Sequence, residues 1–242
     1  MPRELFTYAL ISAPMPFQMA LDEILFERLI ETAQAQAVLR FYYASEPWIS
    51  IGYSHAGWKS QPTSAHSQGL LRDGRNRPVC RRITGGGRVV HGEDIMFTLM
   101  APKDAEPSFS SVMGSYTRIH EILLDSLGAC GIQAGFYRED ADLPQGKDCF
   151  LFPIASDLEF RGKKIAGGGQ KRSRGYLLHQ ESVCLDRQDL YEGLRSDFSA
   201  RFAAALGRDL KDCDWDPLMF EEAERLGNSK YAAACGSGVE AV

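Results

Sequence analysis

The sequence predicts an α+β domain in which a mixed β-sheet is flanked by helices. Runs of β-branched and aromatic residues dominate the middle of the chain, and amphipathic helical runs occur at intervals around them. The 242 residues, 44% of them hydrophobic, are also enough to bury a large core. We therefore expect a single domain over residues 1–242, with a tail that is frayed from about residue 236.

Helical spacing of apolar residues marks the predicted helices. In the first of them, leucines recur on one face, and Asp22, Glu23 and Glu27 are assigned to the more polar faces. Serine caps, closing glycines and an Asp-Pro pair mark the ends of the others. The four predicted helices run through residues 17–33, from 108–111 to 128 or 131, through 190–202, and from 216–217 onward.

The predicted strands are short runs rich in β-forming residues and bounded by glycine or proline. The first two are expected to be joined by a short turn as a hairpin. Two polar segments, 59–78 and the acidic stretch 138–148, are predicted to be loops. The strands cover residues 38–44, 48–53, 94–101, 157–167 and 175–185.

Composition and charge argue against several classes of protein. The formal net charge of -5 and the isoelectric point near 5.6 disfavour nucleic-acid binding. The sequence has neither a run of about 18 apolar residues nor a charged leader before an apolar run, so we expect a cytoplasmic protein without membrane association. Its six cysteines form no CxxC pair, which argues against a disulfide framework or a metal site.

Two segments share a pattern of paired basic residues, isoleucine, a small residue and three glycines: RRITGGGRVVH at 81–91 and KKIAGGGQKR at 163–172. Successive glycines let backbone N–H groups turn toward one point, which forms a nest for an anion or a polarised oxygen. Arg82 suits a carboxylate or phosphate because its planar fork donates paired hydrogen bonds, whereas Lys164 offers a point charge. A pair of such loops would hold an activated carboxyl group.

The alternative for each segment alone is a flexible turn or bulge beside a solvated basic strand end. The presence of two such segments in one chain favours a binding site over that alternative. Neither segment is a phosphate-binding loop of the GxxxxGK[ST] type, and neither matches GxGxxG in a βαβ setting.

Both segments resemble signatures of the biotin and lipoate protein ligase superfamily, in its lipoate-protein ligase and octanoyltransferase branch. RRITGGGRVVH is similar to RRx[ST]GGxxVxH, and GKKIAGGGQKR is similar to GxKixGxaqxR. Weaker support comes from MALDEIL, LRFYYASEPWISIGY and LLHQESVCL, so the resemblance runs from about residue 15 to residue 190.

The resemblance implies an enzyme that attaches an octanoyl or lipoyl group to a specific lysine of a lipoyl-carrier domain. The acyl donor would be an octanoyl or lipoyl compound, such as the group carried by an acyl carrier protein. Lys164 is implied to bind the carbonyl of the acyl group. The residues implied to line the acyl and phosphate side of the pocket are Arg82, Thr84, Gly85, Gly86, Gly87, His91, Gly167 and Gln170.

Two mechanisms fit the resemblance, and a cysteine discriminates between them. Cysteine-class octanoyltransferases carry a Cys-Phe pair before the lysine motif, and Cys149-Phe150 precedes Lys164 by a similar spacing. We therefore favour a transferase that needs no cofactor, with Cys149 and Lys164 as its catalytic residues. The alternative is a ligase that uses ATP and Mg²⁺ to form an acyl-adenylate, and Gly87 is the usual ligase residue at its position. The accessory C-terminal domain of many ligases is expected to be absent.

A third possibility is a non-catalytic, lipoyl-domain-binding accessory subunit, which the charged residues converging on the glycines argue against. His179 is expected to be a hydrogen-bonded histidine at a strand end, where Glu181 replaces the glycine typical of the branch. The histidines expected at the surface are His55, His66 and His120. The cysteines expected to pack as small apolar residues are Cys80, Cys130, Cys184, Cys213 and Cys235.

Overall fold

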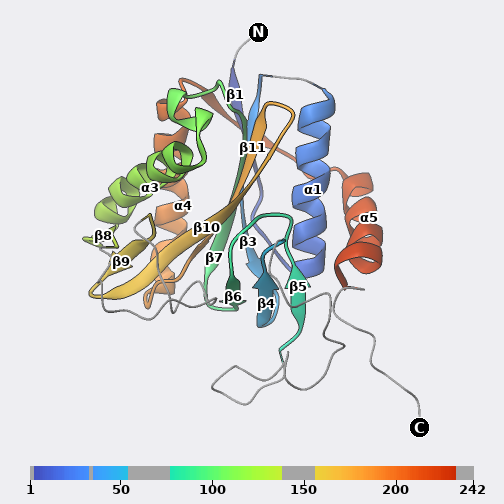
Figure 1. The fold of residues 1–242 in the computed structure, drawn as a ribbon, viewed down its shortest axis with the longest axis horizontal. Coiled ribbons are helices and arrows are strands. Elements are labelled where there is room, and N and C mark those ends of the chain that lie inside the picture. Colours follow the sequence, from blue (N-terminus) through green and yellow to red (C-terminus); the bar gives the residue numbers. More distant parts are fainter. Residues whose placement is uncertain (1–2, 33–34, 54–76, 138–155, 233–242) are drawn as a thin grey trace.

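The computed structural model describes residues 3–32, 35–53, 77–137 and 156–232. Within these residues the chain forms a large mixed sheet with helices on both of its faces, and a second, small sheet (Figure 1). This arrangement confirms the predicted α+β class. No helix in this part of the chain combines the length and the apolar character needed to cross a membrane.

The large sheet has nine strands within the described residues, in the order β12-β1-β3-β7-β11-β10-β9-β8, with β2 beside β3. β1 pairs in parallel with β12 and β3, and β2 pairs in parallel with β3, whereas the other neighbours are antiparallel. The strands are β1 (Glu4–Tyr8), β2 (Ile11–Ala13), β3 (Ala37–Ala44), β7 (Ile95–Pro102), β8 (Gly135–Phe136), β9 (Leu158–Phe160), β10 (Lys163–Ser173), β11 (Tyr176–Val183) and β12 (Asp209–Cys213).

The small sheet has the order β5-β4-β6 and holds the first glycine segment between β5 and β6. Helices α1 and α5 cover one face of the large sheet, and α3 and α4 cover the other (Figure 1). The remaining elements are β4 (Trp48–Ile51), β5 (Val79–Arg81), β6 (Arg88–His91), α1 (Met15–Glu31), α3 (Val112–Ala129), α4 (Tyr191–Ala205), α5 (Pro217–Leu226), and the short turns η1 (Pro107–Ser110), η2 (Gln188–Leu190) and η3 (Gly227–Ala232).

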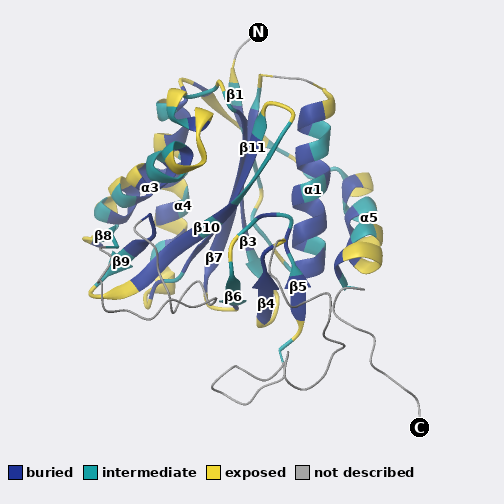
Figure 2. Cartoon of the chain, in the orientation of Figure 1, coloured by how far each residue is buried: buried dark blue, intermediate teal, exposed yellow. Residues whose placement is uncertain are grey.

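Two apolar cores lie on opposite faces of the large sheet, and its central strands are buried (Figure 2). Side chains alternate along a strand, so β7 supplies Phe97 and Leu99 to the core under α3 and α4, and Met96 and Met100 to the core under α1 and α5. A central strand that serves both cores must be apolar at nearly every position, as β7 is.

One charged residue of α1 departs from the predicted polar face. Asp22 is completely buried, and its carboxylate accepts a hydrogen bond from Nε of Arg40 on β3 at 2.6 Å. Arg40 is equally buried and also donates to the side-chain and backbone oxygens of Gln18. The prediction that Asp22 is surface-facing is therefore wrong, because a buried cation on the neighbouring strand takes the place of water.

The predicted hairpin between residues 38–44 and 48–53 is also wrong. Both strands exist, but β3 lies in the large sheet between β1 and β7, whereas β4 lies in the small sheet between β5 and β6. β3 is buried along most of its length and takes its partners from strands distant in sequence, so the short connection turns the chain from one sheet into the other.

The single strand predicted at 157–167 is instead a hairpin of β9 and β10. Arg161 and Gly162 both adopt positive φ, 54° and 74°, and form the tight turn between the two strands. Six of the observed strands were not predicted: β2, β5, β6, β8, β1 and β12. The last two lie at one edge of the large sheet. Their few residues carry charges and no strong alternation, and they pair with each other across nearly the whole sequence.

Candidate active site

The two glycine segments lie side by side, as the sequence pattern predicted. The backbone N–H of Gly85 donates to the carbonyl of Gln170 at 3.4 Å. A Cβ atom at Gly169 would lie only 2.6 Å from the carbonyl oxygen of Gly85, so this approach requires a glycine. The segments differ in form, however. Gly86 has a φ of 95° in a true loop, whereas Gly167, Gly168 and Gly169 form part of the extended strand β10, so the second predicted glycine loop is wrong.

A cavity of about 660 Å³ opens where the first glycine loop meets β10. Most of its charged lining is basic: Arg81 ends β5, Arg82 begins the loop, Lys171 lies on β10 and Lys230 lies on η3. Such a lining suits an anionic or strongly polarised group. The full lining is Glu23, Tyr53, Arg81, Arg82, Ile83, Gly85, Gln170, Lys171, Lys230 and Tyr231.

Lys164 lies on β10, close to the contact between the two glycine segments. Its ammonium donates to Oδ2 of Asp157 at 2.7 Å, and both side chains are almost completely buried. The pairing of β9 with β10 shifts register between Lys164 and Ala166, and the lysine side chain curls back over Gly167. A Cβ atom at Gly167 would lie 2.5 Å from the lysine Nζ, so that glycine makes room for the ion pair.

A chain of hydrogen bonds, from Arg82 through Ser50 and His91 to Asp94, holds Arg82 in place. Its guanidinium donates to Oγ of Ser50 at 3.1 Å and to the carbonyl of Gly85 at 2.8 Å. Ser50 lies 2.8 Å from Nε2 of His91, and Nδ1 of His91 lies 2.7 Å from Oδ2 of Asp94. Both ring nitrogens of His91 are therefore used within the protein, and this residue supports Arg82 through Ser50 from outside the cavity lining.

Asp94 is the last residue of this chain of hydrogen bonds and is itself held by further donors. Its carboxylate also accepts from Oγ of Ser182 at 2.6 Å and from the backbone N–H of Gly92 at 3.0 Å. Burial raises the pKa of Asp94, but the charge and hydrogen bond of His91 and these two further donors outweigh burial and hold the pKa below its usual range. The Asp94 carboxylate at Nδ1 and the Ser50 hydroxyl at Nε2 therefore hold the ring of His91 in place.

Thr84 ties the same loop to the buried ion pair of α1 and β3. Its hydroxyl donates to Oε1 of Gln180 at 2.7 Å, and Nε2 of Gln180 donates to Oδ2 of Asp22 at 2.6 Å. Thr98 also donates to that carboxylate oxygen at 2.8 Å. These hydrogen bonds fix the first glycine loop to the large sheet, and the Thr84 hydroxyl has Gln180 as its partner.

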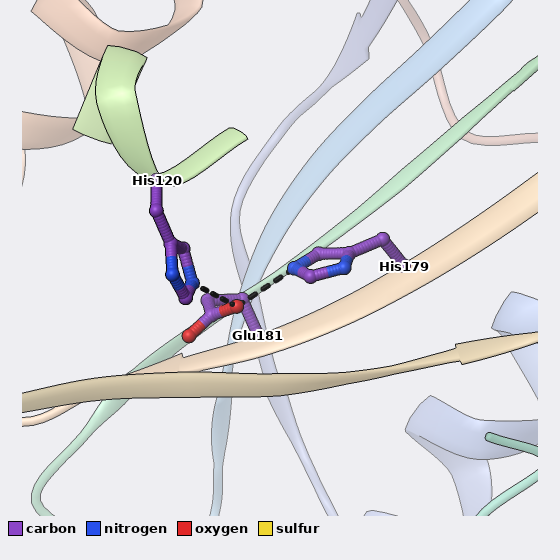
Figure 3. A group of neighbouring side chains, drawn as sticks. All are labelled: His120, His179 and Glu181. Carbon is purple, nitrogen blue, oxygen red and sulfur yellow. Dashed lines mark hydrogen bonds and ion pairs between the residues drawn. The ribbon is translucent and has the colours of Figure 1, made fainter. Parts of the chain in front are cut away.

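Three buried side chains converge on the opposite face of the sheet (Figure 3). Nε2 of His179 lies 2.7 Å from Oε2 of Glu181, and Nε2 of His120, on α3, lies 3.1 Å from the same oxygen. All three residues are fully or almost fully buried. The expectation that His120 lies at the surface is wrong, because the carboxylate and the Ser156 carbonyl provide its two nitrogens with buried partners.

Opposing effects set the pKa values in this cluster. Burial raises the pKa of Glu181, but the charge and hydrogen bond of His120 and the contact with His179 outweigh burial and bring its pKa to about 2. Burial lowers the pKa of His120, but the charge of Glu181, its hydrogen bond and the Ser156 carbonyl raise it above the ordinary value. Burial dominates for His179 and lowers its pKa. The pKa values of the two histidines therefore shift in opposite directions, although both rings contact the same carboxylate oxygen.

Among the described residues, these three form the one group whose donor atoms, all within 4.8 Å of one another, are of the types that bind a metal ion. Their hydrogen bonds to each other already occupy those atoms. Gln170 contacts this cluster as well, since its amide nitrogen lies 3.1 Å from Nδ1 of His179. Its side chain therefore points to the face opposite the glycine loop, and its backbone faces the cavity.

The cysteines divide into a described set and two that lie elsewhere. Cys80 is buried, as expected for a small apolar residue. Burial raises the pKa of the thiols of Cys130, Cys184 and Cys213, which disfavours the nucleophilic thiolate. Cys149 and Cys235, together with His55 and His66, lie outside the described residues, so their predicted roles stay predictions.

The sequence missed Asp157, which holds Lys164, and Ser50, which holds Arg82. A single acidic residue before a strand and a serine within one carry no spacing signal of their own. The buried pair Asp22 and Arg40 did leave a signal, because each charge interrupts an apolar run. Such an interruption predicts a buried partner when it recurs in two neighbouring elements.

One family and several known proteins match this chain. The family described as the lipoyl protein ligase A/B catalytic domain matches residues 14–203. The octanoyltransferase LipM of Kyrpidia tusciae is 29% identical over 241 residues, which cover 93% of this chain and 84% of that enzyme. The LipM of Geobacillus kaustophilus is 30% identical over 82% of this chain and 72% of that enzyme. For the LipM of Oceanobacillus iheyensis, the match spans 69% of this chain and 59% of that enzyme.

Solved structures share the fold. A lipoate-protein ligase A bound with ATP superposes with a TM-score of 0.68 at 18% identity, covering 95% of this chain and 96% of the other. The bipartite lipoate protein ligase of Thermoplasma acidophilum, described together with its E2 lipoyl domain, gives a TM-score of 0.62 at 16% identity, with coverage of 95% and 94%. At these identities the likeness extends to the fold alone.

Proposed function

Because the chain belongs to the lipoyl protein ligase A/B catalytic domain family, we propose that it attaches an octanoyl or lipoyl group to a lysine of a lipoyl-carrier domain. One observation carries the proposal furthest. The buried ammonium of Lys164, held by Asp157, lies over Gly167 of the second glycine segment. A cavity with a largely basic lining opens where that segment meets the first, and Lys164 itself is not among its lining residues. This combination fits the polar head of an acyl donor, whose carbonyl oxygen gains negative charge during transfer.

Cysteine-dependent octanoyl transfer is the form of the reaction that we favour. The full-length relatives are octanoyltransferases by name, and Cys149 has the spacing from Lys164 that the cysteine-class enzymes have. In the first step the Cys149 thiolate attacks the carbonyl carbon of an octanoyl thioester on a carrier protein. The carrier thiolate leaves and takes up the proton that Cys149 lost.

In the second step the amine of the acceptor lysine attacks the Cys149 thioester. The amide bond forms, the carbon–sulfur bond breaks, and a proton from the attacking amine passes to the Cys149 sulfur. In both steps Lys164 donates a hydrogen bond to the carbonyl oxygen, and Asp157 orients its ammonium. Arg82 keeps the first glycine loop in place through its bond to the Gly85 carbonyl.

ATP-dependent ligation is the second candidate, and the cavity lining is the observation that favours it. Arg81, Arg82, Lys171 and Lys230 would suit a phosphate chain, whereas the one lining carboxylate, Glu23, is paired with Lys230 at 2.6 Å. The described lining residues therefore suit the phosphate groups of ATP better than they suit a magnesium ion. In that reaction ATP would activate free octanoic or lipoic acid by converting it to an acyl-adenylate.

The test combines the purified protein with an octanoyl-carrier donor and a lipoyl domain, with and without Mg-ATP. We expect modification of the lipoyl domain without ATP, an intact-mass adduct of one octanoyl group on the enzyme, and loss of both in Cys149→Ser. Cys130→Ser serves as the control, because burial raises the pKa of that described thiol, and it should keep both signals. Strict ATP dependence with an active Cys149→Ser variant would select the ligase instead.

A further inference from the structure

The cluster of His120, His179 and Glu181 is a buried charged group that the proposed reaction does not use directly. Ionised side chains are costly to bury, and apolar residues of similar volume would often stabilise the protein as well or better. Room for the carboxylate comes from Gly168, directly opposite on β10, where a Cβ atom would collide with Oε2 of Glu181.

Hydrogen-bond directions fix the protons of His120. Nδ1 faces the carbonyl oxygen of Ser156, which can only accept, so this nitrogen carries a proton. Nε2 faces the carboxylate of Glu181, which when ionised can also only accept. His120 is therefore an imidazolium that spans from α3 to two acceptors, one on β11 and one just before β9.

The same reasoning makes His179 neutral. The amide oxygen of Gln170 accepts from Oγ of Ser115 at 3.0 Å and from the guanidinium of Arg172 at 3.3 Å, so its NH₂ group faces Nδ1 of His179. Nδ1 is then the acceptor, and Nε2 donates to Glu181. Tyr116 packs edge-on against both histidine rings and donates to the Gly168 carbonyl, which closes the cluster.

Ser156 and Asp157 connect this cluster to the other face of the sheet. The carbonyl of Ser156 accepts from His120, and the side chain of the next residue, Asp157, pairs with Lys164. Because alternate residues of a strand face opposite sides, Gly168 and Gln170 face the cluster whereas Gly167 and Gly169 face Lys164 and the glycine loop. Charges of alternating sign follow one another along this path, from Lys164 through Asp157 and His120 to Glu181.

We propose that His120 and Glu181 are positioning residues, which fix Ser156 and Asp157 from the far face of the sheet so that Asp157 holds the Lys164 ammonium in its reactive orientation. This role rests on the proposed function of Lys164 in acyl transfer. His179 completes the cluster by donating to Glu181 and by connecting it to Gln170 of the glycine strand. We call this connection, from Glu181 and His120 through Ser156 to Asp157, the brace.

The first experiment measures the brace without turnover, by nitrogen-15 NMR of the histidine rings and of the lysine ammonium groups. In the wild-type protein at neutral pH we expect both ring nitrogens of His120 to be protonated and one of His179. Glu181→Gln should remove one proton from His120 and shift the Lys164 ammonium resonance. A neutral His120 in the wild type, or a Lys164 resonance unmoved by Glu181→Gln, would overturn the proposal, and neither readout depends on the reaction catalysed.

The second experiment measures the reaction. Glu181→Gln and His120→Gln should lower kcat between about 10-fold and 100-fold, the scale of a reacting group displaced by a fraction of an ångström to one ångström, with KM for the lipoyl domain within about twofold. Ile119→Val, a conservative change beside His120 in the same helix core, is the control for lost packing and should keep kcat within about twofold. Assays run well below the unfolding temperature of every variant.

A double-mutant cycle separates this role from general damage. If the brace acts through Asp157, Glu181→Gln should lower kcat little further in an Asp157→Asn background. Independent, multiplying losses would contradict the proposal. Stoichiometric zinc in the purified protein that Glu181→Gln removes would also overturn it, because a metal at Glu181 would take the place of the two N–H donors. If Lys164→Ala leaves the reaction intact while the NMR signatures hold, the proposed function fails and the brace remains.

Discussion

The two glycine segments share a sequence pattern but use their glycines differently. In the first, Gly86 takes a φ that L-residues rarely adopt, and a Cβ atom at Gly85 would meet nothing within 4 Å. In the second, the backbone is an ordinary strand, and each glycine removes a Cβ atom that would strike a neighbour. The first segment needs glycine for its backbone conformation, and the second needs it for space.

This difference shows how one motif can serve two faces of a sheet. Gly167 and Gly169 admit Lys164 and the first loop on one side, and Gly168 admits Glu181 on the other. A loop could not do this, because its residues do not alternate between two faces. The strand therefore joins the candidate reaction site to the charged cluster behind it, while the loop shapes the cavity.

The largest expected effect is the loss of one of the two lysines that begin the second segment, Lys163 and Lys164. Lys164→Ala should lower the rate of lipoyl-domain modification by at least about 100-fold, the usual scale for losing one preorganised electrostatic donor. Lys163→Ala is the matched control. Its ammonium lies at the surface, 3.1 Å from Asp186, and exposed ion pairs contribute little. Equal losses in the two variants, measured by mass spectrometry of the lipoyl domain, would contradict the distinction between the lysines.

A second prediction compares the two uses of glycine directly. Gly169→Ala should separate the segments and lower the free energy of unfolding by about 1–3 kcal/mol, as overpacking does. We also expect its transfer rate to fall by about tenfold, because the loop moves relative to Lys164. Gly86→Ala places an L side chain at a φ of 95°, so it should lower the free energy of unfolding by about 1–2 kcal/mol through backbone strain rather than through overpacking. Urea unfolding and the initial rates of acyl transfer, measured on both variants, test this prediction.

The smallest effect concerns the pH dependence of stability. Glu181 has a folded pKa of about 2, below its ordinary 4.5, so the stability it contributes is present above pH 4.5 and is lost as pH falls toward 2. His120 has a raised pKa, so its contribution is complete below pH 6.5 and is lost as pH rises through the folded value.

Glu181→Gln should therefore cost most between these limits, about 2 kcal/mol, because the amide still accepts one N–H bond. The difference from the wild type should shrink as pH falls toward 2. Thermal or urea unfolding measured across this range checks the prediction. A stability difference that does not change with pH would mean that Glu181 is not ionised in the folded protein.

The sequence predicted the parts of the site that carry a spacing signal. Arg82 and Lys164 were singled out because basic pairs precede glycine runs, and their roles in the reaction stay predictions. The predicted contact between the two segments is confirmed. Asp157 and Ser50 were not found, because their roles arise only when separate strands meet. His120 was assigned to the surface because a lone histidine on a helix has no periodic partner, and its partner Glu181 lies 61 residues away.

The same limit applies to the fold. The α+β class and the main helices follow from apolar periodicity, which is a local property. The division of β3 and β4 between two sheets is not local, because it depends on which distant strands pair with each. The edge strand β12 has exposed, charged residues and little pattern, so only its pairing with β1 defines it.

The pairing of β1 with β12 has a consequence for biosynthesis. Residues 4–8 are synthesised well before residues 209–213, so one edge of β1 can pair with β3 early, whereas the other edge gains its partner only when residues 209–213 emerge. An unpaired strand edge is a template for aggregation, and contacts between distant parts of a chain form slowly. One edge of β1 therefore stays open in the nascent chain until residues 209–213 have been made.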